Sequence, residues 1–195
     1  AGEEPQGYLL GCYRVELEDG YLKSYQKAEL DGMLKEDTPP SGDIWYAYLM
    51  IAEKSSWWNN QTYVNTLDKR AIDRFIQVTH ERYYEVLGKD FGTSIPAIFT
   101  DEPQFMQMEH LGFANEKRGI ALPFTDDLEE TFLQAYENSL INRLPELIWE
   151  QKGKAATLRY QYINHLTDRF TQAYAKNIGN WCENHGIALT GHMKG

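Results

Sequence analysis

The stretch that most constrains this chain is an apolar run, residues 95–103, which ends in Asp101, Glu102 and Pro103. The run is short, rich in β-branched and aromatic residues, and preceded by Gly92, so it predicts a strand rather than a helix. In parallel α/β sheets, ligands bind at the carboxyl ends of the strands. Strand side chains alternate between two faces, so we expect only one of the two acids to face a given pocket. Glu102 is therefore a candidate catalytic residue.

Composition restricts the class of partner. Of 195 residues, 42% are hydrophobic and 13% aromatic, which is enough for one buried core. The net charge of -10 disfavours nucleic acid and anionic membrane surfaces as partners and fits a neutral substrate. No apolar run approaches the roughly 18 residues of a membrane span, and no signal peptide begins the chain. Both a cytoplasmic and a bacterial extracytoplasmic location, periplasmic or secreted, stay open.

Cysteine and histidine usage predicts no metal site. Cys12 and Cys182 are too few for a disulfide framework and lack a partner cluster, so we expect two buried thiols. The histidines are scattered without ligand spacing, which disfavours a transition-metal site.

A strand–helix–strand order precedes Glu102. Residues 44–51 are nearly continuous in apolar and aromatic groups, which is typical of a strand buried on both faces. Residues 66–87 carry apolar side chains at spacings of three and four, which predicts a helix. With the strand at 95–100, these segments predict a right-handed βαβ unit with parallel strands.

The C-terminal part repeats this order. Residues 154–183 predict one long helix with a single apolar stripe, and residues 187–190 predict another short buried strand. Its end places His192 at the same sheet edge as Glu102. A histidine there is either a hydrogen-bonded core residue or a contact to a ligand.

These segments predict the fold class and the domains. Asp19 and Gly20 lie between strand-like runs, so residues 1–43 are expected to form a β-hairpin and a loop leading into the next domain. Residues 44–195 are expected to form an α/β domain, a partial (β/α)8 (TIM) barrel with parallel strands and long helices. A complete barrel has eight strands in roughly 250 residues. The chain is therefore expected to be a segment of a larger, multidomain enzyme, and catalytically incomplete alone.

Adjacent tryptophans follow the first predicted parallel strand. Trp57 and Trp58 lie in a polar loop with Asn59, Asn60 and Gln61. Aromatic faces in such loops stack on flat ligand surfaces, including the C–H faces of sugars, while nearby amides bond hydroxyls. The alternative is that one or both indoles cap the core.

The acid motif and its surroundings resemble a known family. Asp101-Glu102-Pro103 looks like the Asn/Asp-Glu-Pro motif that carries the acid/base glutamate of many barrel glycoside hydrolases. No phosphate-binding loop, dinucleotide fingerprint or nucleophile elbow competes with it. A wider pattern resembles the barrel region of α-L-rhamnosidase-like (family 106-like) glycoside hydrolases over about two-thirds of the chain. It is made up of residues 63–67, 98–104, 144–147 and 181–192.

The resemblance implies hydrolysis of a glycosidic bond in a plant or microbial polysaccharide, by two carboxylates and with inversion. It also implies that calcium could bind in the active centre. By this resemblance, Glu102 corresponds to the proton donor of the motif, and Asp101 corresponds to the polar residue that precedes it. His192 corresponds to a histidine at a strand end that touches sugar hydroxyls.

The second carboxylate is left open. Asp101, Glu53 and Glu109 are the candidates within this chain, and none of them lies at a later strand end. Glu102 itself could instead be a structural carboxylate.

Two non-catalytic interpretations stand beside the hydrolase. The first is a carbohydrate-binding domain that uses Trp57 and Trp58, and the second is an interaction domain whose long helix packs on a partner.

Overall fold

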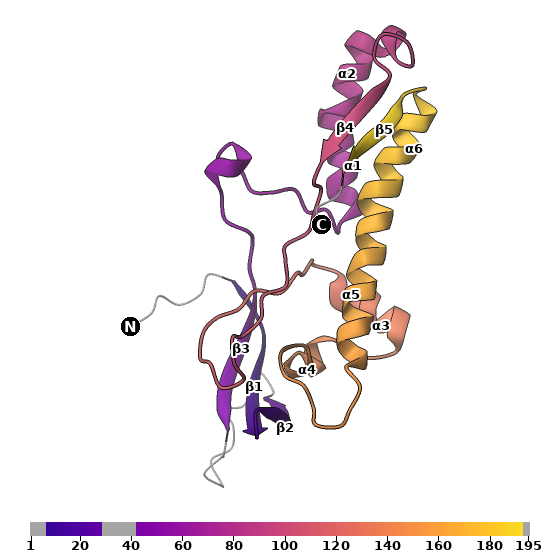
Figure 1. Cartoon of the computed structure of the whole chain (residues 1–195). Coiled ribbons are helices and arrows are strands. Elements are labelled where there is room, and N and C mark those ends of the chain that lie inside the picture. Colours follow the sequence, from indigo (N-terminus) through magenta and orange to yellow (C-terminus); the bar gives the residue numbers. More distant parts are fainter. Residues whose placement is uncertain (1–6, 29–41, 193–195) are drawn as a thin grey trace. The chain divides into compact units, whose positions relative to one another are not determined.

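The computed structural model describes residues 7–28 and 42–192, and the chain divides into two compact units. The first unit comprises Ala1–Glu53 and Met108–Ile163, and the second comprises Lys54–Gln107 and Asn164–Gly195. Figure 1 shows the elements in chain order. These interleaved units do not coincide with the expected segments 1–43 and 44–195, and most of the loop expected before residue 43 lies outside the described residues.

The first unit contains an antiparallel sheet. Strands β1 (Tyr8–Glu18), β2 (Tyr21–Ala28) and β3 (Asp43–Leu49) are arranged in the order β2-β1-β3. Asp19 and Gly20 connect the first two strands with φ angles of 54° and 82°. Positive φ at both central residues is what a two-residue hairpin turn requires, so the predicted hairpin is confirmed.

The expected role of residues 44–51 is wrong. Strand β3 pairs antiparallel with β1, with Trp45 opposite Tyr13, and takes no part in a βαβ unit. Its aromatic residues do not reflect burial on both faces: Tyr46 is 60% exposed, while Trp45 packs edge-to-face on Trp149 with ring centroids 5.0 Å apart. Aromatic residues suit any pleated, half-buried surface, so the apolar run did not specify a parallel sheet.

Short helices complete the core of the first unit. They are α3 (Leu128–Tyr136), η3 (Ile141–Arg143) and α4 (Pro145–Ile148). The Tyr13 hydroxyl donates a hydrogen bond to the Ile141 carbonyl, at 2.6 Å, and the Trp149 indole N–H donates to the Ala114 carbonyl, at 2.8 Å. These bonds fix buried polar atoms beside an otherwise apolar core.

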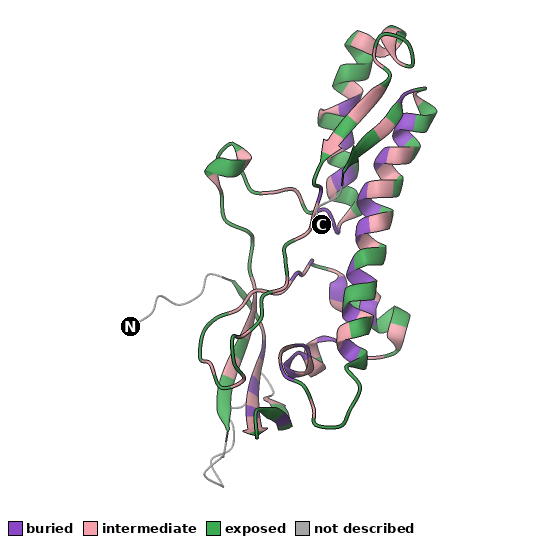
Figure 2. Cartoon of the chain, viewed as in Figure 1, coloured by how far each residue is buried: buried purple, intermediate pink, exposed green. Residues whose placement is uncertain are grey.

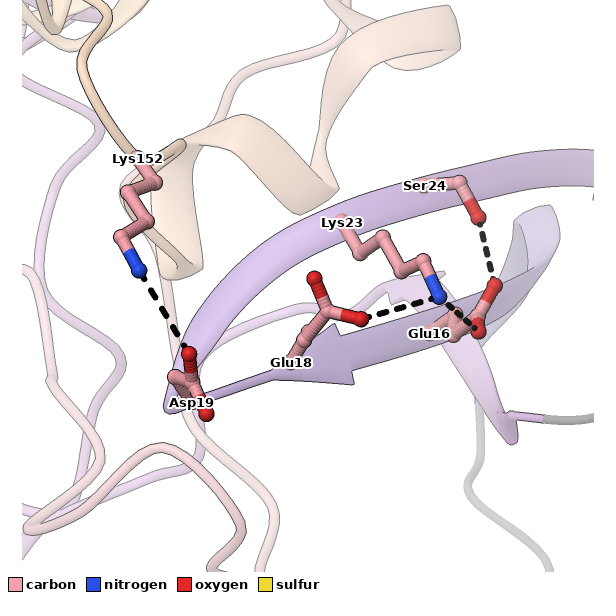
Figure 3. Close-up of polar contacts among 6 residues, drawn as sticks. All are labelled: Glu16, Glu18, Asp19, Lys23, Ser24 and Lys152. Carbon is pink, nitrogen blue, oxygen red and sulfur yellow. Dashed lines mark hydrogen bonds and ion pairs between the residues drawn. The ribbon is translucent and has the colours of Figure 1, made fainter.

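Exposed ion pairs lie on the hairpin of the first unit. Lys23 Nζ lies 3.1 Å from carboxylate oxygens of both Glu16 and Glu18, as Figure 3 shows. Lys152 reaches the turn residue Asp19, at 3.4 Å. Exposed pairs of this kind contribute about 0–1 kcal/mol each, so they do not determine the fold.

The second unit begins with two consecutive helices. The predicted helix over residues 66–87 is divided into α1 (Lys69–Val78) and α2 (His80–Leu87), with Thr79 between them. Asp68 caps α1, because its side chain accepts a hydrogen bond from the Arg70 backbone N–H at 2.9 Å. A short turn, η2 (Gly88–Asp90), then leads toward β4 (Ala97–Asp101).

The long C-terminal helix is confirmed. It consists of α5 (Thr157–Phe170), the π-helical segment η4 (Thr171–Lys176) and α6 (Asn177–Asn184), and α5 is divided between the units after Ile163. Its apolar stripe is buried within the chain, although Tyr160 and Ile163 of α5 are exposed. The buried members include Leu158, Tyr162, Leu166, Phe170, Ala173, Tyr174 and Trp181.

The second unit also contains a parallel strand pair. Strand β5 (Ala188–His192) pairs with β4 in parallel, and α6 packs beside β5 (Figure 1). The strand predicted after the long helix is therefore confirmed, but its expected burial is wrong, because its residues are exposed or intermediate. In Figure 2, β4 and β5 carry intermediate and exposed residues, in contrast to the buried stripes on the helices.

The prediction of a partial (β/α)8 barrel is wrong. Among the described residues, the strands form a three-stranded antiparallel sheet and a single parallel pair, which is too few parallel strands for a barrel segment. Closure of a barrel requires a continuous series of parallel strands, each bonded to the next. The physical reason for the difference is that β3 is hydrogen-bonded to β1 of the hairpin rather than to β4.

Candidate functional site

The candidate site lies at the carboxyl end of the β4–β5 pair. In the parallel register, Asp101 is opposite His192 and Phe99 is opposite Thr190. His192 Nδ1 lies 3.2 Å from Asp101 Oδ1. The expectation that His192 and the acid motif share one sheet edge is confirmed.

One face of this pair is open to solvent. Register and strand alternation place Phe99, Asp101 and His192 on that face. The Phe99 ring is 60% exposed and meets the His192 ring edge-on, with centroids 5.5 Å apart. Thr100 points to the opposite face, where its hydroxyl is hydrogen-bonded to that of Tyr174 at 2.7 Å. The open face therefore combines an apolar ring with a carboxylate–imidazole pair.

Glu102 follows directly, in an unusual backbone conformation. Its φ angle is 43°, in the left-handed region, and its N–H donates to the His192 carbonyl at 3.0 Å. A left-handed conformation is disfavoured for a residue with a Cβ, and a following proline restricts Glu102 further to extended conformations. Pro103 is buried, which anchors this turn. Such strain, about 1–3 kcal/mol, is found where the surroundings fix a functional residue.

Gly191 allows the two strands to approach. Its φ angle is 146°, and a Cβ built on it would lie 1.9 Å from the Thr100 carbonyl oxygen. Only glycine therefore fits here. The position of His192, one residue later, depends on this close contact.

The tryptophan loop is ordered and separate from the β4–β5 pair. Ser55 caps the 3-10 turn η1 (Ser56–Trp58), and Asn59 and Asn60 both have positive φ, at 53° and 57°. Trp58 packs on Tyr63, with ring centroids 4.5 Å apart, whereas Trp57 is 81% exposed. The structure thus assigns Trp58 a packing role and leaves the face of Trp57 available.

The structure gives these tryptophans a different place from the one expected. They were expected at the end of a strand parallel to β4, but β3 belongs to the antiparallel sheet. The ring contacts of Trp57 are with Trp58 in the described part of the chain, rather than with Asp101, Glu102 or His192. The predicted convergence of three strand ends is therefore reduced to the ends of β4 and β5.

The other candidate carboxylates differ in their surroundings. Glu109 accepts a hydrogen bond from the Ala121 N–H at 3.0 Å and lies 3.7 Å from Arg118, which is a structural role. Glu53 is exposed. Sequence reasoning did not select Phe99, although strand alternation places it on the face of Asp101.

No group of three or more histidine, cysteine, aspartate or glutamate side chains lies close enough to hold a metal ion within residues 7–28 and 42–192. The calcium implied by the resemblance thus has no carboxylate cluster to bind it there. Cys182 is buried, which raises the pKa of its thiol, while Cys12 is half-buried rather than buried as expected. No helix in the described ranges has the length and apolar character needed to cross a membrane.

Comparison with known proteins adds no relative. No family model, curated protein or solved structure matches this chain. The resemblance to rhamnosidase-like enzymes stays a prediction that rests on the residues alone.

Proposed function

We propose that this chain cleaves a glycosidic bond with Glu102 as the proton donor. The observation that carries the proposal is the left-handed conformation of Glu102 at the end of β4. Glu137 also has a positive φ, as the residue that ends α3, but among the described non-glycine residues with positive φ only Glu102 is followed by a proline. Here the strained residue directly follows Asp101 at the strand end, and its backbone N–H is bonded to the carbonyl of His192.

The open face supplies the other contacts that a sugar needs. The ring of Phe99 can stack on the C–H face of a pyranose, and Asp101 and His192 can bond its hydroxyls. On the resemblance, an α-L-rhamnoside is the first substrate to test.

The reaction also needs a second carboxylate. Inversion requires a base roughly 6.5–9.5 Å from the acid, to activate a water molecule on the opposite side of the sugar ring. Asp101 is the candidate that belongs to the same unit as Glu102. We propose inversion as the resemblance implies it.

The test is hydrolysis of a panel of aryl glycosides, led by the α-L-rhamnoside, by the chain and its Glu102→Gln variant. We expect kcat to fall by about 10²–10⁴-fold in the variant, since general acid catalysis contributes that much. The loss should be smaller with a 2,4-dinitrophenyl leaving group, which departs without a proton. The matched control is Glu85→Gln, at an exposed glutamate of α2, and should leave kcat unchanged.

Two results contradict the proposal. One is hydrolysis that Glu102→Gln leaves intact, and the other is the absence of hydrolysis of every glycoside by the wild-type chain at high protein concentration.

A second candidate function is carbohydrate binding without catalysis. It is favoured by Trp57, whose ring is 81% exposed on a loop that hydrogen bonds and two left-handed asparagines hold in place. An exposed indole on a rigid loop offers a flat apolar face at little entropic cost, which is how aromatic residues bind sugars.

A glycan-binding measurement tests this second candidate. Trp57→Ala should weaken binding of a soluble oligosaccharide about tenfold, and Trp57→Phe should retain part of it because a ring face remains. Tyr160→Ala, which removes a 73% exposed ring on α5, is the control. Equal affinity of Trp57→Ala and wild type would exclude this role.

A further inference from the structure

A largely apolar cavity of about 330 Å³, partly open to solvent, lies in the second unit beside β4, where Ile98, Phe99 and Thr100 line it. Its walls come from α1, α2, α6 and both strands of the parallel pair. The apolar side chains that line the cavity include Phe75, Tyr83, Leu87, Ile98, Ile178 and Leu189.

A hydroxyl pair forms one polar part of the wall, which Thr79, His80 and Tyr83 also line. Thr100 and Tyr174 both line the cavity, and their hydroxyl oxygens are 2.7 Å apart. Each hydroxyl has one hydrogen to donate, and their mutual bond uses only one of the two. The second hydrogen has no acceptor among the residues that the structure describes. A donor without an acceptor is unfavourable among apolar side chains, so this pair favours a guest that carries an acceptor oxygen.

His80 contributes a neutral ring to the wall rather than a charge, and its Nδ1 atom has no hydrogen-bond partner among the residues that the structure describes. It is 5% exposed, it contacts the rings of Phe75 and Trp181 edge-on, and burial lowers the pKa of its imidazole. With His80 neutral, none of the described lining residues is charged. The cavity therefore does not suit an ionic ligand, nor a sugar, whose many hydroxyls would stay unpaired in it.

The backbone beside the cavity is also unusual. Tyr174 lies in η4, where the long helix changes from α-helical to π-helical hydrogen bonding. Turns of π-helix are rare and are found frequently at functional sites. This irregularity coincides with the residue that carries one of the two hydroxyls.

We propose that this cavity binds a small neutral molecule with one aromatic ring and a single acceptor oxygen, such as an aryl ketone. An apolar cavity of roughly 150 Å³ already admits benzene, so this larger one accommodates a substituted ring. The ring fills the apolar part, and the oxygen accepts the spare hydrogen of the Thr100–Tyr174 pair. The proposal differs from the glycosidase, because its polar contact comes from Thr100 and Tyr174 rather than from Asp101, Glu102 and His192, although Phe99 borders both sites.

Acetophenone and α-methylstyrene are suitable probes, since they have the same shape and differ only in the replacement of a carbonyl oxygen by a methylene group. Titration followed by two-dimensional NMR of the ¹³C-labelled isoleucine methyl groups gives both affinities. We expect both probes to shift the methyl signals of Ile98 and Ile178, which line the cavity, while that of Ile141 in the first unit stays in place. Binding of neither probe would overturn the proposal.

The double variant Thr100→Val/Tyr174→Phe removes both hydroxyls with almost no change in volume. We expect it to bind acetophenone about three- to tenfold more weakly than wild type, because one hydrogen bond is lost. Its affinity for α-methylstyrene should be unchanged or higher. Equal changes for the two probes would overturn the role of the hydroxyl pair.

A cavity-filling variant tests the location without removing a polar group. Leu189→Phe adds volume at the wall and should weaken the binding of both probes about tenfold or more. If it folds poorly, Ile98→Phe serves the same purpose from the other strand. Undiminished binding to a folded, filled variant would place the probes elsewhere and overturn the proposal.

Discussion

His192 Nδ1 lies 3.2 Å from Asp101 Oδ1 and joins the ends of two parallel strands that are far apart in the sequence. Both side chains are largely exposed, at 62% and 71%, so their attraction contributes about 0–1 kcal/mol to stability. Stability alone does not account for this pair. Its effect is to orient the imidazole over the open face, next to Phe99.

Asp101→Ala should therefore change function more than stability. We expect a free energy of unfolding within about 1 kcal/mol of wild type, and a KM for the aryl glycoside that rises about tenfold as His192 loses its orientation. Asp101→Asn keeps an acceptor oxygen and should retain more of the affinity. Steady-state kinetics and urea unfolding measure both effects, and an unaltered KM in both variants would contradict this role.

Gly191→Ala should disrupt the parallel pair. The added Cβ meets the Thr100 carbonyl oxygen at 1.9 Å and the φ angle of 146° is strained for alanine, so we expect a loss of at least about 2 kcal/mol. Gly179→Ala is the control in α6, where a Cβ meets nothing within 4 Å. It should stabilise the chain by about 0.5–1 kcal/mol, because alanine is the better helix former. Urea unfolding of both variants measures whether Gly191→Ala lowers the free energy of unfolding and Gly179→Ala raises it.

Glycine should be preferred to alanine at position 102. In the left-handed region a Cβ costs roughly 1–2 kcal/mol, so Glu102→Gly should be about 1 kcal/mol more stable than Glu102→Ala. At Glu85, inside α2, the order should reverse by a similar amount. The four variants can be compared by their unfolding midpoints. The same order at both positions would show that the strain at Glu102 is absent in solution.

Stability should fall steeply above pH 10. Burial, followed by the nearby charge of Glu129, raises the pKa of Tyr13 above its usual range, and burial together with the hydrogen bond to Glu146 raises the pKa of Tyr25 to about 12. The unfolded chain loses these protons near pH 10 and the folded chain only later, so between those values the unfolded state binds fewer protons. Below pH 10 this contribution is fully present.

The Tyr13→Phe variant isolates the contribution of Tyr13 to this loss of stability at high pH. At pH 8 it should be about 1–2 kcal/mol less stable than wild type, because the Ile141 carbonyl loses its donor. For buried Tyr13 the slope reaches up to about 1.4 kcal/mol per pH unit, so the deficit should shrink by pH 11. Urea unfolding at both pH values measures it, and a deficit that stays constant would contradict the shifted titration.

Several elements could be predicted because their causes are local. The turn at Asp19 and Gly20 follows from the residues that tolerate positive φ, and the long helix from Thr157 to Asn184 follows from one apolar stripe. The short strand after it, and its approach to the acid motif, followed from chain order. In each case the dihedral preference or periodicity lies within a few residues of the element itself.

The pairing of strands could not be predicted in the same way. The run at 44–51 satisfied the pattern of a buried parallel strand, yet β3 bonds to β1, and the predicted barrel disappears with that pairing. The hydrogen bonds of a strand can be satisfied by either kind of neighbour. The choice is then made by side chains distant in sequence, such as Trp149 against Trp45.

By itself, the sequence determined where most helices and strands lie and that Asp101, Glu102 and His192 would share one edge. Only the tertiary structure decided that Asp101 pairs with His192, that Glu102 is held in a left-handed conformation, and that Thr100 and Tyr174 face a cavity. The reason is physical: secondary structure arises from preferences summed over neighbouring residues, whereas strain, pairing and cavities arise from the packing of segments that the sequence holds far apart.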